Sequence, residues 1–299
     1  MVRQCVACDS EKIVKSFENK YMSVFKCKSC SHLQGVHKEK FVNEDYHHQE
    51  LDDPFIQSLK KTRKFQANII IEEIKKMGSD ISMLDFGCGR GWFVEECFNS
   101  GFKDLVGADY SKVAVQNLIS KSIHAYQVTD EDFTSKFQNF TKNLNRRVTM
   151  VSFLDVIEHF DSENIQEMIQ NIISGKEIRH VIIKVPDSNG FFFIIASLLS
   201  KMGLDKPLNQ LFQVFSFPPH YQYFNRKSFL KFSEKLNLEV IKEIPEKDFT
   251  LDESFTDRLQ FSFFLPKKII LLIVKSLFYF VNLFGLLDSR IYFCIKKDK

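Results

Sequence analysis

The chain has 299 residues, of which 41 are Lys or Arg and 38 are Asp or Glu, so its formal net charge is +3 at pH 7. With 44% hydrophobic and 26% charged residues, the composition is that of a globular protein and excludes a disordered, collagen-like or disulfide-scaffold chain. Because the charges nearly balance, nucleic-acid binding would require a local basic patch. Phe is abundant, with 32 residues, and many follow residue 190, which indicates an unusually apolar C-terminal half.

Residues 1–5 lack the apolar core and cleavage site of a signal peptide, so we expect a cytoplasmic protein with reduced thiols. Four of its seven cysteines form two C-x2-C pairs separated by 18 residues, which are Cys5, Cys8, Cys27 and Cys30. Each pair can place two thiolates on one tight turn, and two such turns complete the tetrahedral sulfur shell that zinc prefers. Four thiolates close that shell, so we expect structural Zn²⁺ in a zinc ribbon over residues 1–48.

Two alternatives to this zinc site remain at the level of sequence. Nearby histidines could replace a thiolate as a ligand, the candidates being His32, His37, His47 and His48. The cysteines could also be unrelated buried side chains. Redox and disulfide roles are disfavoured because both pairs recur at ribbon spacing.

A glycine-rich turn follows a predicted helix over residues 57–77. The apolar run 81–86 leads directly into Gly87-Cys88-Gly89-Arg90-Gly91, and a helical pattern comes next. Glycines permit close backbone approach and open the N-terminus of a helix to a polar ligand group. A second predicted strand, 105–109, ends in an acid 18 residues beyond Gly91, a suitable position for accepting hydrogen bonds from ribose hydroxyls.

The same elements could bind a nicotinamide dinucleotide, but two residues argue against it. A dinucleotide fingerprint needs a third small residue where Trp92 stands. Asp85 precedes the glycines, where a carboxylate would repel a pyrophosphate and attract an ammonium group. A ligand that carries both a ribose and an amino acid would satisfy Asp85 and Asp109, and S-adenosylmethionine is such a ligand.

The motif Leu84–Gly91, followed by Val106–Ser111, resembles the class I S-adenosylmethionine-dependent methyltransferases. Residues 150–159, which include Glu158-His159, and residues 181–187 are similar to the fourth and fifth strands of that family. With the cysteine pairs, the chain resembles bacterial methyltransferases of sugar and surface-glycan biosynthesis. The resemblance implies an α/β fold over residues 49–299: a doubly wound, mainly parallel seven-stranded sheet with an antiparallel last strand.

The resemblance also implies roles for individual residues around the cofactor. At the amino-acid end of the cofactor, the backbone would be lined by Gly87, Gly89 and Gly91, Asp85 would lie near the ammonium group, and Leu154 would pass close to the methionine moiety. At the nucleoside end, Asp109 would hold the ribose, Tyr110 would flank the adenine, and Asp130 would reach the adenine amino group. For Asp130, the alternative is a helix N-cap, and its acidic neighbours leave the choice of acid open.

Two histidines are candidates for accepting a proton from the methyl acceptor. Imidazole titrates close to neutrality, which suits general-base catalysis. His159 follows the predicted fourth strand, and His220 lies in a segment that resembles the entry to the last helix of glycan-type methyltransferases. We expect His220, ahead of His159, to be the catalytic residue; alternatively, each histidine only hydrogen-bonds a loop.

Two apolar segments, 191–204 and 267–287, interrupt the predicted domain as helical insertions. The second is nearly long enough to span a bilayer. However, residues 289–297 alternate like a strand that must return to the sheet beside residues 238–244. The lysines suit a helix that lies in a membrane interface with its ammonium groups toward anionic headgroups, and one hypothesis is a cytoplasmic protein in peripheral contact with the inner membrane face. The alternative is a helical subdomain that packs on the core or forms a dimer.

The sequence thus predicts methyl transfer to a small molecule, a sugar or glycan intermediate that could be lipid-linked. The first alternative is an RNA methyltransferase that uses the ribbon to bind substrate, but residues 1–50 carry eight Lys and Arg against seven Asp and Glu, so nucleic acid is not expected. A second is a non-catalytic scaffold, which the intact glycines and Asp109 disfavour. The acceptor and the oligomeric state are left open, because acceptor pockets in this fold come from variable insertions.

Overall fold

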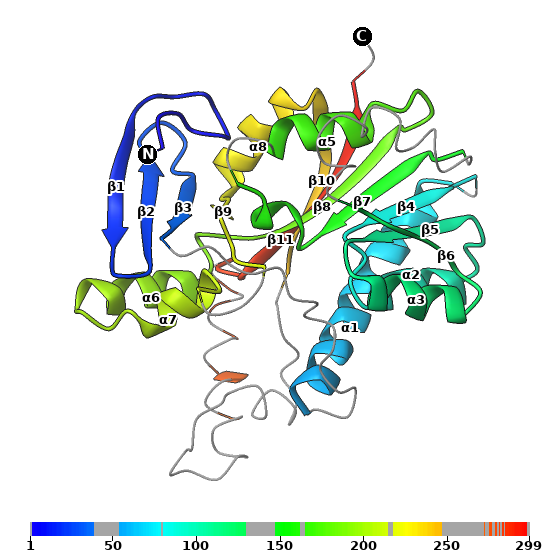
Figure 1. Ribbon diagram of the computed structural model, residues 1–299, viewed down its shortest axis with the longest axis horizontal. Coiled ribbons are helices and arrows are strands. Elements are labelled where there is room, and N and C mark those ends of the chain that lie inside the picture. Colours follow the sequence, from blue (N-terminus) through cyan, green and yellow to red (C-terminus); the bar gives the residue numbers. More distant parts are fainter. Residues whose placement is uncertain are drawn as a thin grey trace.

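The computed structural model describes residues 2–38, 54–78, 80–129, 147–161, 165–214, 218–246 and 285–297, and also residues 272, 275, 276, 279, 281 and 283. The described residues form two sheets, one of seven strands in the order β10-β11-β8-β7-β4-β5-β6 and one of four in the order β1-β2-β3-β9 (Figure 1). The predicted boundary between the two domains, after residue 48, lies outside the described residues and stays a prediction.

The large sheet confirms the predicted fold class. Its strands β4, β5, β6, β7 and β8 pair in parallel, and β11 runs antiparallel between β8 and β10. The last strand therefore lies beside residues 238–246, as expected. The bounds are β4 (Met83–Phe86), β5 (Leu105–Asp109), β6 (His124–Gln127), β7 (Met150–Leu154), β8 (His180–Pro186), β10 (Leu238–Glu246) and β11 (Ser289–Lys296).

Helices cover both faces of the large sheet (Figure 1). One face packs against α1 (Pro54–Lys76), α2 (Trp92–Asn99) and α3 (Lys112–Ser120), and the other against α5 (Ile165–Ile173) and α8 (Arg226–Lys235). The helix α5 illustrates the cause, since Ile165, Met168, Ile169 and Ile172 recur at helical spacing and are all buried. Burial of these apolar faces positions the loops at the carboxyl ends of the parallel strands.

The N-terminal segment forms most of the small sheet. Its antiparallel strands are β1 (Ile13–Glu18), β2 (Met22–Cys27) and β3 (Leu33–His37). The fourth strand, β9 (Gln222–Tyr223), comes from the other end of the chain and pairs with β3, Leu33 facing Tyr223. The small sheet also packs on α6 (Phe191–Lys201) and α7 (Lys206–Leu211), which lie along its lower end in Figure 1.

The two apolar insertions differ in how far the structure describes them. Residues 191–204 include α6, the predicted helix. Of residues 267–287, residues 267–271 and several later positions lie outside the described part, and the described positions 272, 275, 276, 279, 281 and 283 are helical. Within the described residues, no helix combines the length and apolarity needed to cross a membrane.

Candidate functional site

The candidate site lies where β4, β5 and β7 end at one edge of the large sheet. The glycine-rich turn follows β4 directly and leads into α2. In open parallel sheets, ligands bind outside the carboxyl ends of the strands, where neighbouring strands leave a crevice. The sequence-predicted cofactor residues 85–91, 109–110 and 154 all belong to this edge.

Asp109, the last residue of β5, joins that strand to the glycine-rich turn. Its Oδ2 accepts a hydrogen bond from the backbone N–H of Gly89 at 2.7 Å, and its Oδ1 accepts one from the N–H of Ser111 at 2.8 Å. Ser111 then caps α3 by accepting from the N–H of Ala114. The carboxylate is thus held in one orientation by backbone donors, and only 4% of Asp109 is exposed.

Two of the glycines are required by backbone conformation and by packing. Gly87 and Gly91 have φ of +74° and +78°, a region that side chains of L-residues rarely adopt. A Cβ on Gly87 would lie 2.5 Å from Val156, and a Cβ on Gly91 would lie 2.4 Å from Leu118. The backbone of the turn therefore packs directly against Val156 and Leu118, and neither glycine could carry a side chain without a clash.

Asp85, within β4, is a buried acid that pairs with a hydroxyl group. The hydroxyl of Ser152 on β7 donates to its Oδ1 at 2.6 Å. Burial raises the pKa of Asp85 to about 7, and the negative charge of Asp109 adds to this increase. Both acids thus stand close enough to influence one another, and a cation beside Asp85 would relieve the cost of its ionisation.

The residues at this edge fit S-adenosylmethionine. A buried carboxyl group with a raised pKa suits an ammonium group, and a second, rigidly oriented carboxylate suits a pair of hydroxyls. Tyr110, 38% exposed, directly follows Asp109, and Leu154 ends β7, so both lie at the same edge. Asp130 lies outside the described residues, and its role stays a prediction.

His159 and His220 are brought together although they are far apart in the sequence. Their rings form an edge-to-face contact with centroids 4.7 Å apart. His159 ends the short 3₁₀ helix η4 (Ile157–His159), just after β7, and its Nδ1 lies 3.1 Å from the carbonyl oxygen of Pro219. Burial lowers the pKa of His159, which favours the neutral imidazole.

An ionic cluster that the sequence did not predict lies next to these histidines. Lys184, in the middle of β8 and only 1% exposed, donates to both carboxylate oxygens of Asp155 at 2.6 and 2.8 Å. Arg63 on α1 also pairs with Asp155. Asp155 has φ of +56°, an uncommon conformation for a residue other than glycine. A lone lysine within the apolar run of residues 181–185 was the available sequence signal.

Glu158 is the second acid of this region that the sequence analysis did not include among the site residues. It is 1% exposed, and burial raises its pKa well above the usual range, with the charge of Asp155 adding to the effect. Among the described residues, its Oε2 has no hydrogen-bond partner. A buried carboxyl oxygen without a partner is costly and points to a function.

The four predicted metal-ligating cysteines gather in one cluster. All four Sγ atoms lie within 4.8 Å of one another, with Cys5 and Cys30 3.5 Å apart and Cys8 and Cys27 3.7 Å apart. Tetrahedral zinc with Zn–S bonds of about 2.3 Å separates its sulfurs by about 3.8 Å. The cluster therefore fits Zn²⁺, which would crosslink the two turns and supply no catalytic position.

Two of the alternative histidine ligands have other partners. His32 is fully buried, and its Nε2 lies 2.9 Å from the side-chain oxygen of Gln222. The Nε2 of His37 lies 2.9 Å from the carbonyl oxygen of His220. Both thus tie the ribbon to the segment that carries His220, whereas His47 and His48 lie outside the described residues.

Residues 59–243, more than half of the chain, match the family described as "Methyltransferase domain". The chain belongs to this family. Together with the seven-stranded sheet, this makes it a class I S-adenosylmethionine-dependent methyltransferase. No curated protein sequence matches the chain.

Solved methyltransferase structures resemble this methyltransferase over most of its length. Magnesium protoporphyrin IX methyltransferase from Synechocystis PCC 6803 is 13% identical, with coverage of 87% of this chain and 90% of that chain and a TM-score of 0.49. A SAM-dependent methyltransferase from Archaeoglobus fulgidus is 16% identical, with coverage of 77% and 94% and a TM-score of 0.44. A plantazolicin methyltransferase is 17% identical, with coverage of 83% and 86% and a TM-score of 0.44.

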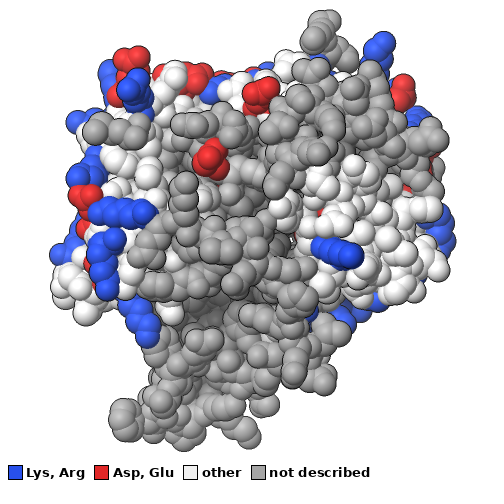
Figure 2. Space-filling model, viewed as in Figure 1, with Lys and Arg blue, Asp and Glu red and all other residues white. Residues whose placement is uncertain are grey.

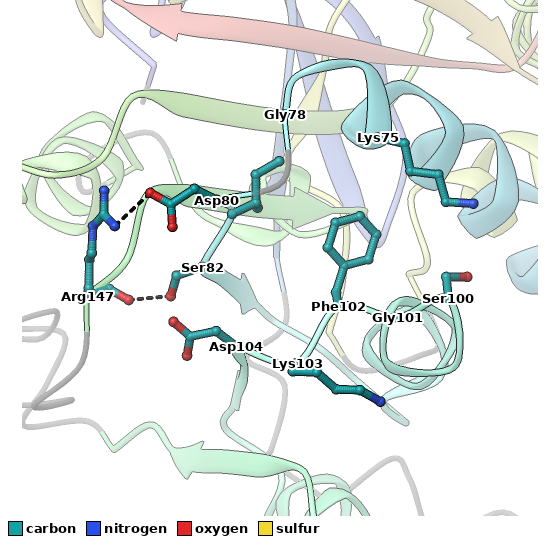
Figure 3. A pocket seen from close by; sticks show the side chains of 11 residues that line it. Lys75, Gly78, Asp80, Ser82, Ser100, Gly101, Phe102, Lys103, Asp104 and Arg147 are labelled. Carbon is teal, nitrogen blue, oxygen red and sulfur yellow. Dashed lines mark hydrogen bonds and ion pairs between the residues drawn. The ribbon is translucent and has the colours of Figure 1, made fainter.

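A hollow of about 600 Å³ lies on the methyltransferase at the opposite edge of the sheet, where β4, β5 and β7 begin (Figure 3). Its wall includes an ion pair of 2.9 Å between Arg147 and Asp80, and the hydroxyl of Ser82 donates to the carbonyl oxygen of Arg147. Because ligands of this fold bind at the carboxyl ends of the strands, this hollow is not the cofactor site.

Proposed function

We propose that this methyltransferase transfers a methyl group to a small-molecule acceptor, a sugar or glycan intermediate whose hydroxyl or amino group loses a proton in the reaction. The observation that carries the proposal is the His159–His220 pair, since His159 follows the strand that ends at Leu154 and its ring contacts the ring of His220. An acceptor that keeps its proton at neutral pH requires such a group, and methyl transfer to a thiolate does not.

The two acids and the two histidines at this edge of the sheet would have different roles in the reaction. S-adenosylmethionine, when bound, supplies an electrophilic methyl group on its sulfonium. Asp85 and Asp109 would bind and orient it, and its alignment with the acceptor supplies most of the rate enhancement. The Nδ1 of each ring has a partner, so His159 or His220 would accept the acceptor proton at Nε2. In His220 this requires the side-chain amide of Gln213, now 2.9 Å from Nε2, to move aside.

A screen of nucleotide sugars and lipid-linked glycans, read out as S-adenosylhomocysteine formed, tests the acceptor class. We expect product with at least one member and none with the Asp109→Ala protein. His220→Ala should lower turnover far more than cofactor affinity, whereas equal losses would exclude it as a catalytic residue. Methylation of RNA instead of any sugar would overturn the proposal in favour of the RNA alternative.

We further propose that the helical segment within residues 267–287 contacts a membrane surface and brings the enzyme to a membrane-proximal acceptor. Leu272, Tyr279 and Leu283 are 65%, 70% and 70% exposed. Their spacing of seven and four residues places them on one face of a helix. Lys275 is also exposed, as an interfacial helix at anionic lipid requires.

A further inference from the structure

A second group of potential metal ligands, separate from the cysteines, consists of Glu158, His159 and His220. One donor atom from each side chain lies within 4.8 Å of the other two. One carboxylate and two imidazoles suit divalent transition metals better than Mg²⁺ or Ca²⁺, which prefer oxygen ligands alone. With bonds of about 2.1 Å, such an ion would require only modest side-chain rotation to bring the three donors together.

Hydrogen bonds fix both histidines in the tautomer that a metal ligand needs. The Nδ1–H of His159 donates to the carbonyl oxygen of Pro219, which leaves the lone pair on Nε2. The Nδ1 of His220 lies 3.1 Å from the hydroxyl of Tyr223, and that hydroxyl donates to the carbonyl oxygen of Leu211 at 2.6 Å. Because the hydroxyl hydrogen is used there, Nδ1 of His220 is the donor and its Nε2 holds the lone pair.

The buried carboxyl group of Glu158 supplies an independent indication of a ligand. Only 1% of the residue is exposed, and Oε2 lacks a partner among the described residues. The backbone is held in place, since the N–H of Tyr221 donates to the carbonyl oxygen of Glu158 at 2.7 Å. The carboxyl group of Glu158 and the two imidazoles thus bring three potential ligand atoms together, and a divalent cation would satisfy the unpartnered carboxyl oxygen and offset the cost of its ionisation.

We propose that Glu158, His159 and His220 bind one divalent transition-metal cation, and that two neighbouring oxygens of the acceptor complete its coordination. The first half is independent of the proposed function, and the second rests on it. In the metal-bound protein the two imidazoles would be ligands in place of proton acceptors. The cation would polarise the acceptor hydroxyl, whose proton would pass to solvent water as the methyl group is transferred. The side-chain amide of Gln213, now 2.9 Å from Nε2 of His220, moves aside when the cation binds.

Manganese(II) is the probe that separates this site from the ribbon, because four thiolates prefer zinc. The zinc-loaded enzyme is titrated with Mn²⁺, and the loss of the free-ion electron paramagnetic resonance signal gives the bound fraction. We expect one Mn²⁺ per chain, and a dissociation constant raised by about tenfold or more in Glu158→Gln and in His220→Gln. The control is Glu234→Gln, which removes the same charge from an exposed residue of α8 and should bind as the wild type does.

Absence of Mn²⁺ binding by the wild type, or equal binding by Glu158→Gln, would overturn the proposal. Calorimetry with S-adenosylmethionine on each variant verifies that the fold and the cofactor site are intact. Methyl transfer to a sugar that persists without Mn²⁺ or any second metal would overturn the coordination of the acceptor by the cation and would leave the proposed function unaffected. Mn²⁺ binding without methylation of any sugar would support the cation site and overturn the proposed acceptor class.

Discussion

Asp85 is the residue at which protonation and cofactor binding are coupled. Its pKa is raised from 3.8 to about 7 in the folded protein. Between these values the folded state keeps a proton that the unfolded state has lost, so the contribution of Asp85 to the free energy of unfolding falls as pH rises from about 4 to about 7. Above that range the ionised carboxylate destabilises the cofactor-free protein.

A positive ammonium group beside Asp85 favours its ionised form, so binding should release a proton below pH 7. We expect cofactor affinity to rise with pH between about 5.5 and 7, by up to about tenfold per unit. Calorimetry in two buffers of different ionisation enthalpy measures the released proton. Asp85→Asn should bind more weakly, show no pH dependence in this range and, without cofactor, unfold at a higher temperature than the wild type at pH 8. An unchanged proton release in that variant would contradict the assignment.

The Asp155–Lys184 pair makes a second prediction at the scale of single residues. Asp155→Asn removes the carboxylate that pairs with the buried ammonium group of Lys184, and we expect a loss of about 3–5 kcal/mol in the free energy of unfolding. Asparagine tolerates the left-handed conformation, so the backbone should not contribute. The double variant Asp155→Asn/Lys184→Met should recover most of the loss in urea unfolding. A single variant as stable as the wild type would show that the pair is energetically neutral.

Residues differ in how far the sequence could predict them. Asp85, Asp109 and the glycines follow one another along the chain in a short motif, so local pattern was sufficient to bring them to one edge. The contacts of Asp155 with Lys184 and Arg63 join three distant segments, and only folding brings them together. Glu158 lies in the segment 150–159, which resembles the methyltransferase family, but its burial and its unpartnered oxygen among the described residues are properties of the folded structure.

At the scale of elements, the N-terminal ribbon is bound to the segment that contains His220, β9 and the start of α8. The strand β3 pairs with β9, and the side-chain amide of Asn225, the cap of α8, donates to the carbonyl oxygen of Cys30 at 3.2 Å. Lys227 donates to the carbonyl oxygen of Ser29. The cysteine spacing predicted the ribbon itself, but these long-range bonds have no signature in the sequence.

Loss of zinc should therefore destabilise the methyltransferase domain as well as the ribbon. We expect Cys27→Ser to abolish zinc binding and to lower the midpoint of a single thermal transition by several degrees, since about 1 kcal/mol moves the midpoint of a 150–250-residue domain by about 2–4 °C. Metal analysis and calorimetry measure both effects. Cys97→Ala, a buried cysteine of α2, is the control and should retain its zinc. Two separate transitions, with the larger one unchanged, would show that the ribbon unfolds independently.

At the scale of the whole molecule, charge and apolar exposure are distributed differently. On the face shown in Figure 2, the described Lys and Arg side chains are interspersed with Asp and Glu and form no single basic field. This distribution agrees with the small net charge and does not favour RNA as a substrate. Exposed apolar side chains instead gather on α6, with Leu198 54% exposed, and within residues 267–287. Hydropathy predicted both segments, but it could not distinguish burial from exposure.

The exposed side chains of Leu272, Tyr279 and Leu283 lead to the prediction that the whole enzyme binds anionic membranes. We expect it to float with vesicles of phosphatidylglycerol and to remain at the bottom with phosphatidylcholine, because apolar burial and lysine attraction are both required for stable binding. Leu272→Glu/Leu283→Glu should abolish flotation. The control Ile119→Glu changes an equally apolar residue, 55% exposed on α3, and should float as the wild type does. Wild-type protein that stays at the bottom with both lipids would contradict membrane contact, and equal flotation of the double variant would assign the contact to another surface, with α6 the first to be tested.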